Sequence, residues 1–93
     1  MPGIPGISEL SAHLATLDDV ELIERFLDEI MTPAEKKAVA LRWELMKLLK
    51  QGVSQRKIAA DLGISLCKIT RGSRIIKDPD SVTNILLAME KKK

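Results

Sequence analysis

Apolar residues along this chain recur at the three- and four-residue spacing of amphipathic helices, and turn-forming residues separate the periodic segments. The clearest stripes are Val20, Ile23, Phe26, Leu27 and Ile30 near the start, and Val82, Ile85, Leu86 and Met89 near the end. No strand-like alternation, internal repeat or low-complexity segment is visible. The pattern predicts an all-α chain of about six helices, over residues 9–15, 18–29 and 33–50, two within 54–77, and one within 79–91.

The first helices have less distinct starts than the later ones. The segment Met1 to Gly6 contains two prolines and two glycines, and we expect it to be irregular and mobile. Ser8 is a candidate cap for the first helix, and residues 16–19 mark a break before the second.

The start of the long helix is marked more clearly. Thr32 and Glu35 are spaced as a capping box, and Pro33 stands in the first turn, where its missing N–H costs little. Gly52 is expected to end this helix. Little of its surface is polar, which indicates burial on more than one side, as in a helix wedged between two subunits.

Residues 54–71 have the pattern of a helix-turn-helix. Ser54 and Ser65 can cap the two helices, and Gly63 can take the left-handed conformation of the turn. The apolar positions that support the motif are Ile58, Ala59, Leu62, Ile64 and Ile69. The second helix of such a motif enters the DNA major groove, whereas an ordinary antiparallel helix pair is the alternative.

Composition narrows the classes of function. A chain of 93 residues makes one small domain with a marginal core, and dimerisation is a natural remedy. The single cysteine, Cys67, and the lone His13 offer neither a disulfide nor a metal cluster, which fits a reducing cytoplasm. We expect no membrane span, because no apolar run is long enough, and no signal peptide, because the start lacks a basic region followed by an apolar core. The sequence contains no nucleophile with a positioned base, no metal-ligand set and no phosphate loop. An enzyme is therefore not expected.

The net charge of +2 conceals an uneven distribution along the chain. Residues 1–31 hold seven acidic residues and one basic residue, whereas residues 50–77 hold seven basic residues and one acidic residue, Asp61. The positive charge therefore coincides with the helix-turn-helix, as a surface that binds phosphates requires.

Several short motifs resemble the Trp repressor superfamily over about residues 30–77, roughly half of the chain. They are Thr32-Pro33-x-Glu35, Arg42, Gly52-x-Ser54-Gln55-Arg56 and Ile69-Thr70-Arg71-Gly72-Ser73. The resemblance implies an intertwined, all-helical homodimer that binds a palindromic operator with L-tryptophan as corepressor, without metal or prosthetic group. It divides the chain into a flexible arm (1–7), dimerisation helices (8–51), a DNA reader (54–77) and a C-terminal dimerisation helix (79–91).

The same resemblance implies a ligand site. Arg42 and Arg71 would bracket the tryptophan, because a guanidinium can stack on an indole face and pair with a carboxylate. Gly72 would leave room for the indole, and the region that includes Met31 and Thr32 of the second subunit would receive the ammonium. Ile75 departs from the family, whose tryptophan-binding members carry a serine there. On the residues alone, the preferred interpretation of Arg42 is a half-buried salt-bridge partner, with Glu35 or Asp61 as candidates.

For DNA, the match gives Arg56 a direct guanine contact, the commonest specific pairing of this kind. The other DNA-binding candidates are Gln55, Lys57, Lys68 and Arg74 for phosphates, and Leu66, Cys67 and Thr70 for base edges. Cys67 could instead be a redox sensor or a plain packing residue. Two further hypotheses remain: a superfamily member gated by another indole or aromatic ligand, or by none, and a small helical module that binds a protein.

Overall fold

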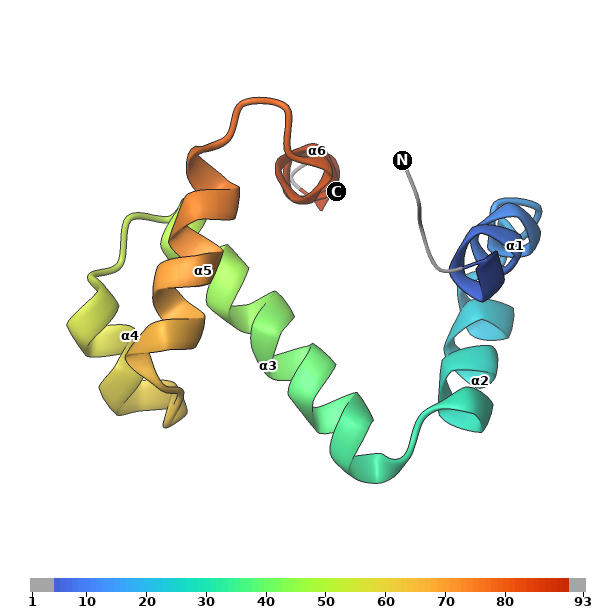
Figure 1. Cartoon of the computed structure of the whole chain (residues 1–93), viewed down its shortest axis with the longest axis horizontal. Helices are drawn as coiled ribbons and strands as arrows, with labels where there is room; N and C mark the ends of the chain where they lie inside the picture. The colour runs from blue at the N-terminus through green and yellow to red at the C-terminus, as the bar shows by residue number, and fades with distance from the viewer. Residues whose placement is uncertain (1–4, 91–93) are drawn as a thin grey trace. The chain divides into compact units, whose positions relative to one another are not determined.

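The computed structural model describes residues 5–90, and all the regular structure within them is helical. The six helices are α1 (Pro5–Leu14), α2 (Val20–Ile30), α3 (Pro33–Lys50), α4 (Gln55–Leu62), α5 (Leu66–Lys77) and α6 (Val82–Glu90) (Figure 1). The predicted all-α class is therefore confirmed. The chain divides into two compact units, residues 1–36 and residues 37–93, and the boundary falls within α3.

In the first unit, α2 begins as expected but α1 does not. The side chain of Asp19 caps α2 by accepting a hydrogen bond of 2.9 Å from the backbone N–H of Glu21. The prediction that α1 follows a cap at Ser8 is wrong, because the helix already begins at Pro5. Proline is favoured in the first helical turn, where its fixed φ is helical and no N–H is needed. Pro5 and Gly6 are thus helical rather than irregular, and the rest of the predicted arm lies outside the described residues.

Local hydrogen bonds fix both ends of α3. Thr32 Oγ1 accepts from the backbone N–H of Glu35 at 3.1 Å, while Glu35 Oε1 accepts from the backbone N–H of Thr32 at 2.9 Å. This is the predicted capping box. At the other end Gly52 has φ +87°, and the backbone N–H of Val53 donates to the carbonyl of Leu48 at 3.0 Å. A glycine in this conformation satisfies the last carbonyls and turns the chain towards α4.

The core of the second unit lies where α3, α4 and α5 meet. Leu45 of α3, Ile58 of α4 and Ile69 of α5 are at most 1% exposed and form one cluster. Partly buried residues that pack around this cluster are Leu48, Leu49, Val53, Ala59, Leu62 and Ile64. The predicted apolar face of the helix-turn-helix is therefore the face that packs, and it packs against Leu45 of α3.

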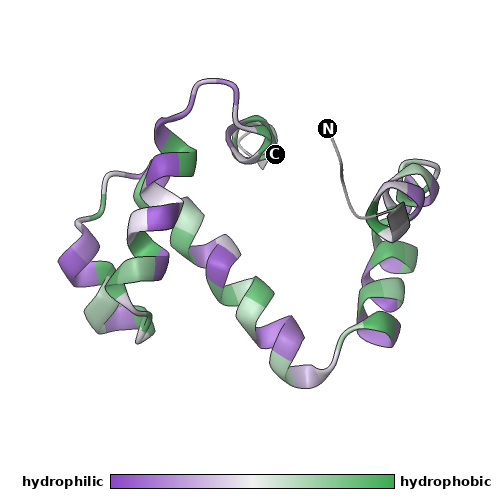
Figure 2. Cartoon of the chain, viewed as in Figure 1, coloured by the Kyte–Doolittle hydropathy of each residue, from purple (hydrophilic) through white to green (hydrophobic). Residues whose placement is uncertain are grey.

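Polar contacts join α6 to the end of α5, and one side chain of α6 is buried among the residues that the structure describes. The Asn84 side-chain amide donates to the carbonyl oxygens of Ile76 and Asp78 at 2.9 and 3.0 Å. Leu87 is 5% exposed, whereas the predicted stripe of α6 is largely exposed, from 47% at Leu86 to 66% at Val82. Figure 2 shows apolar residues along α6 and α3. The apolar stripe of α6 is thus not part of the core of a single chain.

Candidate ligand pocket and nucleic-acid interface

The helix-turn-helix is held by the caps that the sequence predicts. Ser54 and Ser65 accept from the backbone N–H groups of Lys57 and Lys68 at 3.2 and 3.4 Å, and so begin α4 and α5. Gly63 ends α4 in the left-handed region at φ +66°, where its N–H donates to the carbonyl of Ala59. A residue with a Cβ would be strained there, so this glycine determines the angle at which α5 leaves the turn.

Gly72 allows α5 to approach α3 closely. It is buried, and a Cβ added to it would lie 3.2 Å from Leu49 Cδ1, 3.3 Å from Leu45 Cδ2 and 3.4 Å from Met46 Sδ. Such contacts are tighter than ordinary van der Waals separations, so the two helices could not sit at this distance around a larger residue without adjustment. Gly72 therefore permits the close packing of α5 on α3.

A cavity of about 540 Å³ lies beside this crossing of α3 and α5. Its lining residues are Arg42, Leu45 and Met46 of α3, and Lys68, Arg71, Gly72 and Ile75 of α5. Four of the residues predicted to bind a ligand are thus brought together: Arg42, Arg71, Gly72 and Ile75. Met31 and Thr32 lie before the start of α3, outside the lining, and the family resemblance assigns that role to their copies in a second subunit.

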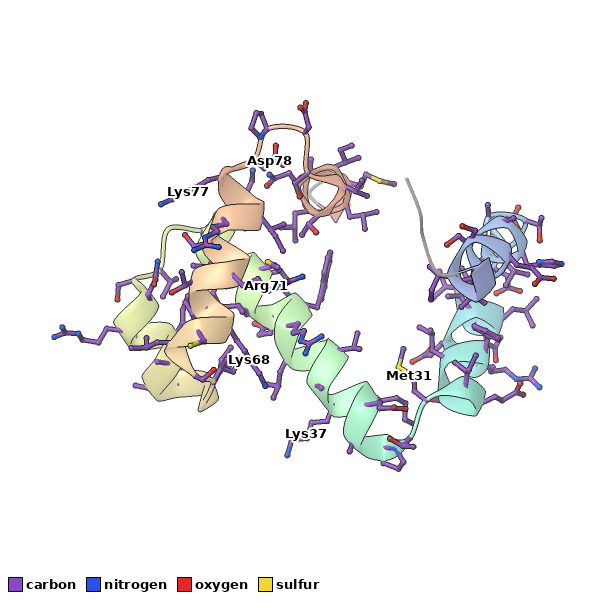
Figure 3. All side chains as sticks on the ribbon, in the orientation of Figure 1. Met31, Lys37, Lys68, Arg71, Lys77 and Asp78 are labelled. Carbon is purple, nitrogen blue, oxygen red and sulfur yellow. The ribbon has the colours of Figure 1, made fainter. Side chains whose placement is uncertain are left out.

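The sequence reasoning missed three lining residues. Leu45 and Met46 follow Arg42 by three and four positions, so the helical spacing that places them on its face was available in the sequence. Lys68, predicted to contact DNA phosphates, precedes Arg71 by three positions on α5 and also lines the cavity. Figure 3 shows Lys68 and Arg71 on the side of α5 near α3, whereas Lys77 projects away.

The arginines of the cavity have no ion-pair partner among the described residues. Asp61 pairs with Lys57 at 3.1 Å, and the carboxylate of Glu35 takes part in the capping box. Neither of the salt-bridge partners suggested for Arg42 is therefore engaged with it. Both Arg42 and Arg71 are exposed, so their guanidinium groups can reach a ligand.

A different face of α5 carries the other DNA-binding candidates. Leu66, Cys67, Thr70 and Arg74 line, together with Arg71, a shallow hollow of about 360 Å³ on the exposed side of the helix. Leu66 is 60% exposed, and its apolar side chain has no core role. Arg71 is the only residue of α5 that lines both this hollow and the cavity, as far as the described residues show.

The first turn of α4 contributes the remaining candidates. Gln55, Arg56 and Lys57 are all exposed, and Arg56 has no ion pair with a described carboxylate. Cys67 is exposed as well, so a packing role for its thiol is not supported. Among the residues that the structure describes, no cluster of three or more metal-ligating side chains occurs, and no helix is long and apolar enough to cross a membrane.

Comparison with known proteins identifies a family. A family model described as Trp repressor protein matches residues 6–91. The chain is 43% identical over 60 residues to a Trp operon repressor homolog of Actinobacillus succinogenes, covering 61% of this chain and 59% of that protein. A homolog with the same description in Chlamydia trachomatis serovar L2 is 37% identical, over 61% of this chain and 66% of that protein. Another in Vibrio campbellii is 36% identical, over 68% of this chain and 69% of that protein.

The matches thus span about three fifths to two thirds of the length of these relatives. No solved structure matches the chain.

Proposed function

This chain belongs to the Trp repressor family. From that premise we propose that it is a transcriptional repressor that binds double-stranded operator DNA as a homodimer. We further propose that it uses L-tryptophan as corepressor. The helix-turn-helix supports the DNA-binding part of the proposal, because its exposed faces carry Arg56, Arg74 and the apolar tip of Leu66. Cationic side chains bind phosphates and guanine edges, and an apolar side chain can contact a thymine methyl group.

The cavity between α3 and α5 is the observation that supports a corepressor site. Arg42 and Arg71 come from different helices and line the same cavity, whose apolar lining includes Leu45 and Met46. A planar guanidinium can stack on an indole ring and bind a carboxylate through two parallel hydrogen bonds. A flat ligand with a carboxylate would link α5 to α3 through both arginines and so fix the orientation of the reader helix.

Exposed apolar side chains support a homodimer. In one chain Val20 is 78% exposed, Trp43 36% and Ile85 57%, and each belongs to a helix predicted to mediate dimerisation. A small chain that leaves this much apolar surface uncovered gains stability by burying it against a second copy. A second copy would also bring its Met31–Thr32 segment to the ligand, in the manner that the family resemblance implies.

The proposal is tested by selecting operator duplexes from random DNA with and without L-tryptophan. We expect a palindromic sequence to be enriched, with an affinity that rises when L-tryptophan is added and falls steeply with salt concentration. Unchanged enrichment without L-tryptophan would favour a repressor gated by another aromatic ligand or by none. Failure to bind any duplex would contradict the repressor and favour a helical module that binds a protein.

Replacing Arg56 by alanine is expected to relax base preference at one position in each half-site. A bidentate contact to guanine contributes about 1–3 kcal/mol of discrimination, whereas a phosphate contact contributes equally to all sequences. The measurement is the affinity for the selected operator and for duplexes changed at single positions. Lys57→Ala is the matched control, since Lys57 follows Arg56 on α4 and pairs with Asp61. Equal weakening of every duplex by Arg56→Ala would reduce Arg56 to a phosphate contact.

A further inference from the structure

We propose that Asn84 is a positioning residue of the helix-turn-helix. Its side chain clamps the end of α5 to α3 and α6, and so fixes the direction in which α5 points. The residue lies on α6, outside the lining of the cavity and of the outer hollow. The inference rests on the proposed function where it concerns operator binding, whereas the clamp itself is a feature of the fold.

The amide of Asn84 forms three hydrogen bonds to segments that are distant in the sequence or belong to other helices. Its Nδ2 group donates to the carbonyl oxygens of Ile76, in the last turn of α5, and of Asp78, which caps that helix, at 2.9 and 3.0 Å. Its Oδ1 accepts from Nζ of Lys50, the last residue of α3, at 2.9 Å. Asn84 itself lies in the first turn of α6, so its side chain joins the ends of α3 and α5 to the start of α6 (Figure 1).

These partners require an amide at this position. The two carbonyl oxygens can only accept and the Lys50 ammonium can only donate, so the group between them must offer both N–H groups and an acceptor. The carbonyl of Ile76 belongs to the last turn of α5, where carbonyls have no partner within the helix. An aspartate would keep the acceptor for Lys50 but would place its negative charge against the two carbonyl oxygens. A leucine would fill a similar space without any of the three hydrogen bonds.

The clamp complements the packing of α5 on α3. Around Gly72 that packing consists of apolar contacts, which are not directional and leave a helix free to turn slightly about the crossing. Hydrogen bonds are directional, and the one at Ile76 is made four residues, or about 6 Å, beyond the crossing. Leu66 lies six residues to the other side, about 9 Å away. A shift of about 1 Å at the clamped end therefore moves the proposed DNA-binding end by about 1.5 Å, which is enough to break hydrogen bonds to bases.

Loss of the clamp is expected to make operator binding depend more strongly on the ligand. A helix-turn-helix that samples several directions binds DNA with an affinity reduced by the fraction of molecules in the competent one. A ligand held between Arg42 and Arg71 would limit the same motion, so the clamp would matter less in its presence. We expect Asn84→Leu, which removes hydrogen bonds of a half-buried amide, to weaken operator binding about tenfold without ligand and about threefold with it.

The first test is hydrogen exchange of the full chain and needs neither DNA nor ligand. Backbone amides in the last turn of α5 should exchange about tenfold faster in Asn84→Leu than in the unmodified protein, because the clamp limits local opening there. The amide of Ile69, in the buried core, should exchange at an unchanged rate. Equal acceleration at Ile69 would reduce Asn84 to a general contribution to stability and overturn the proposal, as would unchanged exchange throughout α5.

Thr83→Val is the matched control for both tests. Thr83 precedes Asn84 on α6, and its side chain forms no hydrogen bond to another helix within residues 5–90. The replacement is nearly isosteric, as Asn84→Leu is, and should leave exchange at the end of α5 unchanged. Acceleration by Thr83→Val equal to that by Asn84→Leu would contradict a specific role of the amide.

The second test measures the affinity for the selected operator with and without L-tryptophan. The ratio of the two affinities should rise about threefold in Asn84→Leu and in Asn84→Asp, and should stay constant in Thr83→Val. Asn84→Asp isolates the hydrogen bonds to α5, because it keeps an acceptor for Lys50 and loses both donors. An unchanged ratio in both Asn84 variants, or in Asn84→Asp alone, would overturn the proposal that these bonds position α5.

The two tests separate this inference from the proposed function. Faster exchange confined to the end of α5, combined with no operator binding by the unmodified protein, would support the clamp and contradict the repressor. Operator binding that ignores L-tryptophan would contradict the corepressor, and a tenfold loss of affinity in Asn84→Leu would still support the role of Asn84. Exchange and operator binding that Asn84→Leu leaves unchanged would overturn the inference while the repressor proposal stands.

Discussion

Replacing Arg71 by alanine is expected to abolish the response of operator binding to ligand while leaving the chain folded and dimeric. Arg71 is exposed, lines the cavity and forms no ion pair with a described residue, so the fold does not depend on it. A charge-assisted contact to a carboxylate contributes about 1.5–3 kcal/mol, which corresponds to about a tenfold to hundredfold loss of ligand affinity. The measurement is operator binding over a range of ligand concentrations.

Arg74→Ala is the matched control for this prediction. Arg74 lies on the same helix and is also exposed, but it lines the outer hollow and not the cavity. Its removal should weaken DNA binding at every ligand concentration and preserve the ratio between the liganded and free states. Arg71→Lys separates charge from shape, because lysine retains the charge but cannot stack or pair as a planar fork. An Arg71→Ala variant that still responds fully to ligand would exclude this residue from the site.

Replacing Ile69 by alanine is expected to lower the free energy of unfolding by about 2–5 kcal/mol. Ile69 is 0% exposed and packs with Leu45 and Ile58, so truncation leaves a cavity at the point where three helices meet. Domains of this kind are stable by only about 5–15 kcal/mol, and the loss is therefore a large fraction of the total. Urea denaturation measures it at one fixed protein concentration, because the stability of the proposed dimer would depend on concentration.

Leu66→Ala is the control for the core prediction. Leu66 lies on the same helix but is 60% exposed, and its truncation should change stability by no more than about 0.5 kcal/mol. The two variants should also differ in DNA binding. Leu66→Ala removes apolar surface from the proposed DNA-binding face of a stable protein, whereas Ile69→Ala loosens the packing of the whole helix-turn-helix. Equal loss of stability in both variants would contradict the position of the core.

The sequence predicted most helix boundaries because these depend on residues no more than four or five positions apart. The capping box of Thr32 and Glu35, the cap at Ser65 and the turn at Gly63 are all formed as expected. A side-chain oxygen that bonds to an N–H three residues away, or a glycine that takes positive φ, needs no distant partner. The start of α1 failed because two boundary signals, Pro5 and Ser8, competed within one turn.

The family was also accessible from the sequence, and the comparisons confirmed it. Membership in a family of DNA-binding regulators agrees with the prediction that the chain is not an enzyme. The lining of the cavity was predicted only in part, because the resemblance supplied Arg42, Arg71, Gly72 and Ile75 but not Leu45, Met46 or Lys68. The roles of all these residues remain proposals for the experiments above.

Tertiary structure alone decided which face of each helix packs against a neighbouring helix. The sequence grouped Lys68 with the DNA-binding residues because it is basic and lies on the reader helix, but the crossing of α5 over α3 at Gly72 turns it towards the cavity. Leu87 of α6 is buried, whereas the predicted stripe of α6 is exposed. Periodicity defines the faces of a helix, but only contacts between residues far apart in the chain determine which face meets which neighbour. The sequence by itself therefore determined the helices, most of their caps and the family, and the packing of α5 on α3 decided that one face of α5 lines the cavity between the two helices.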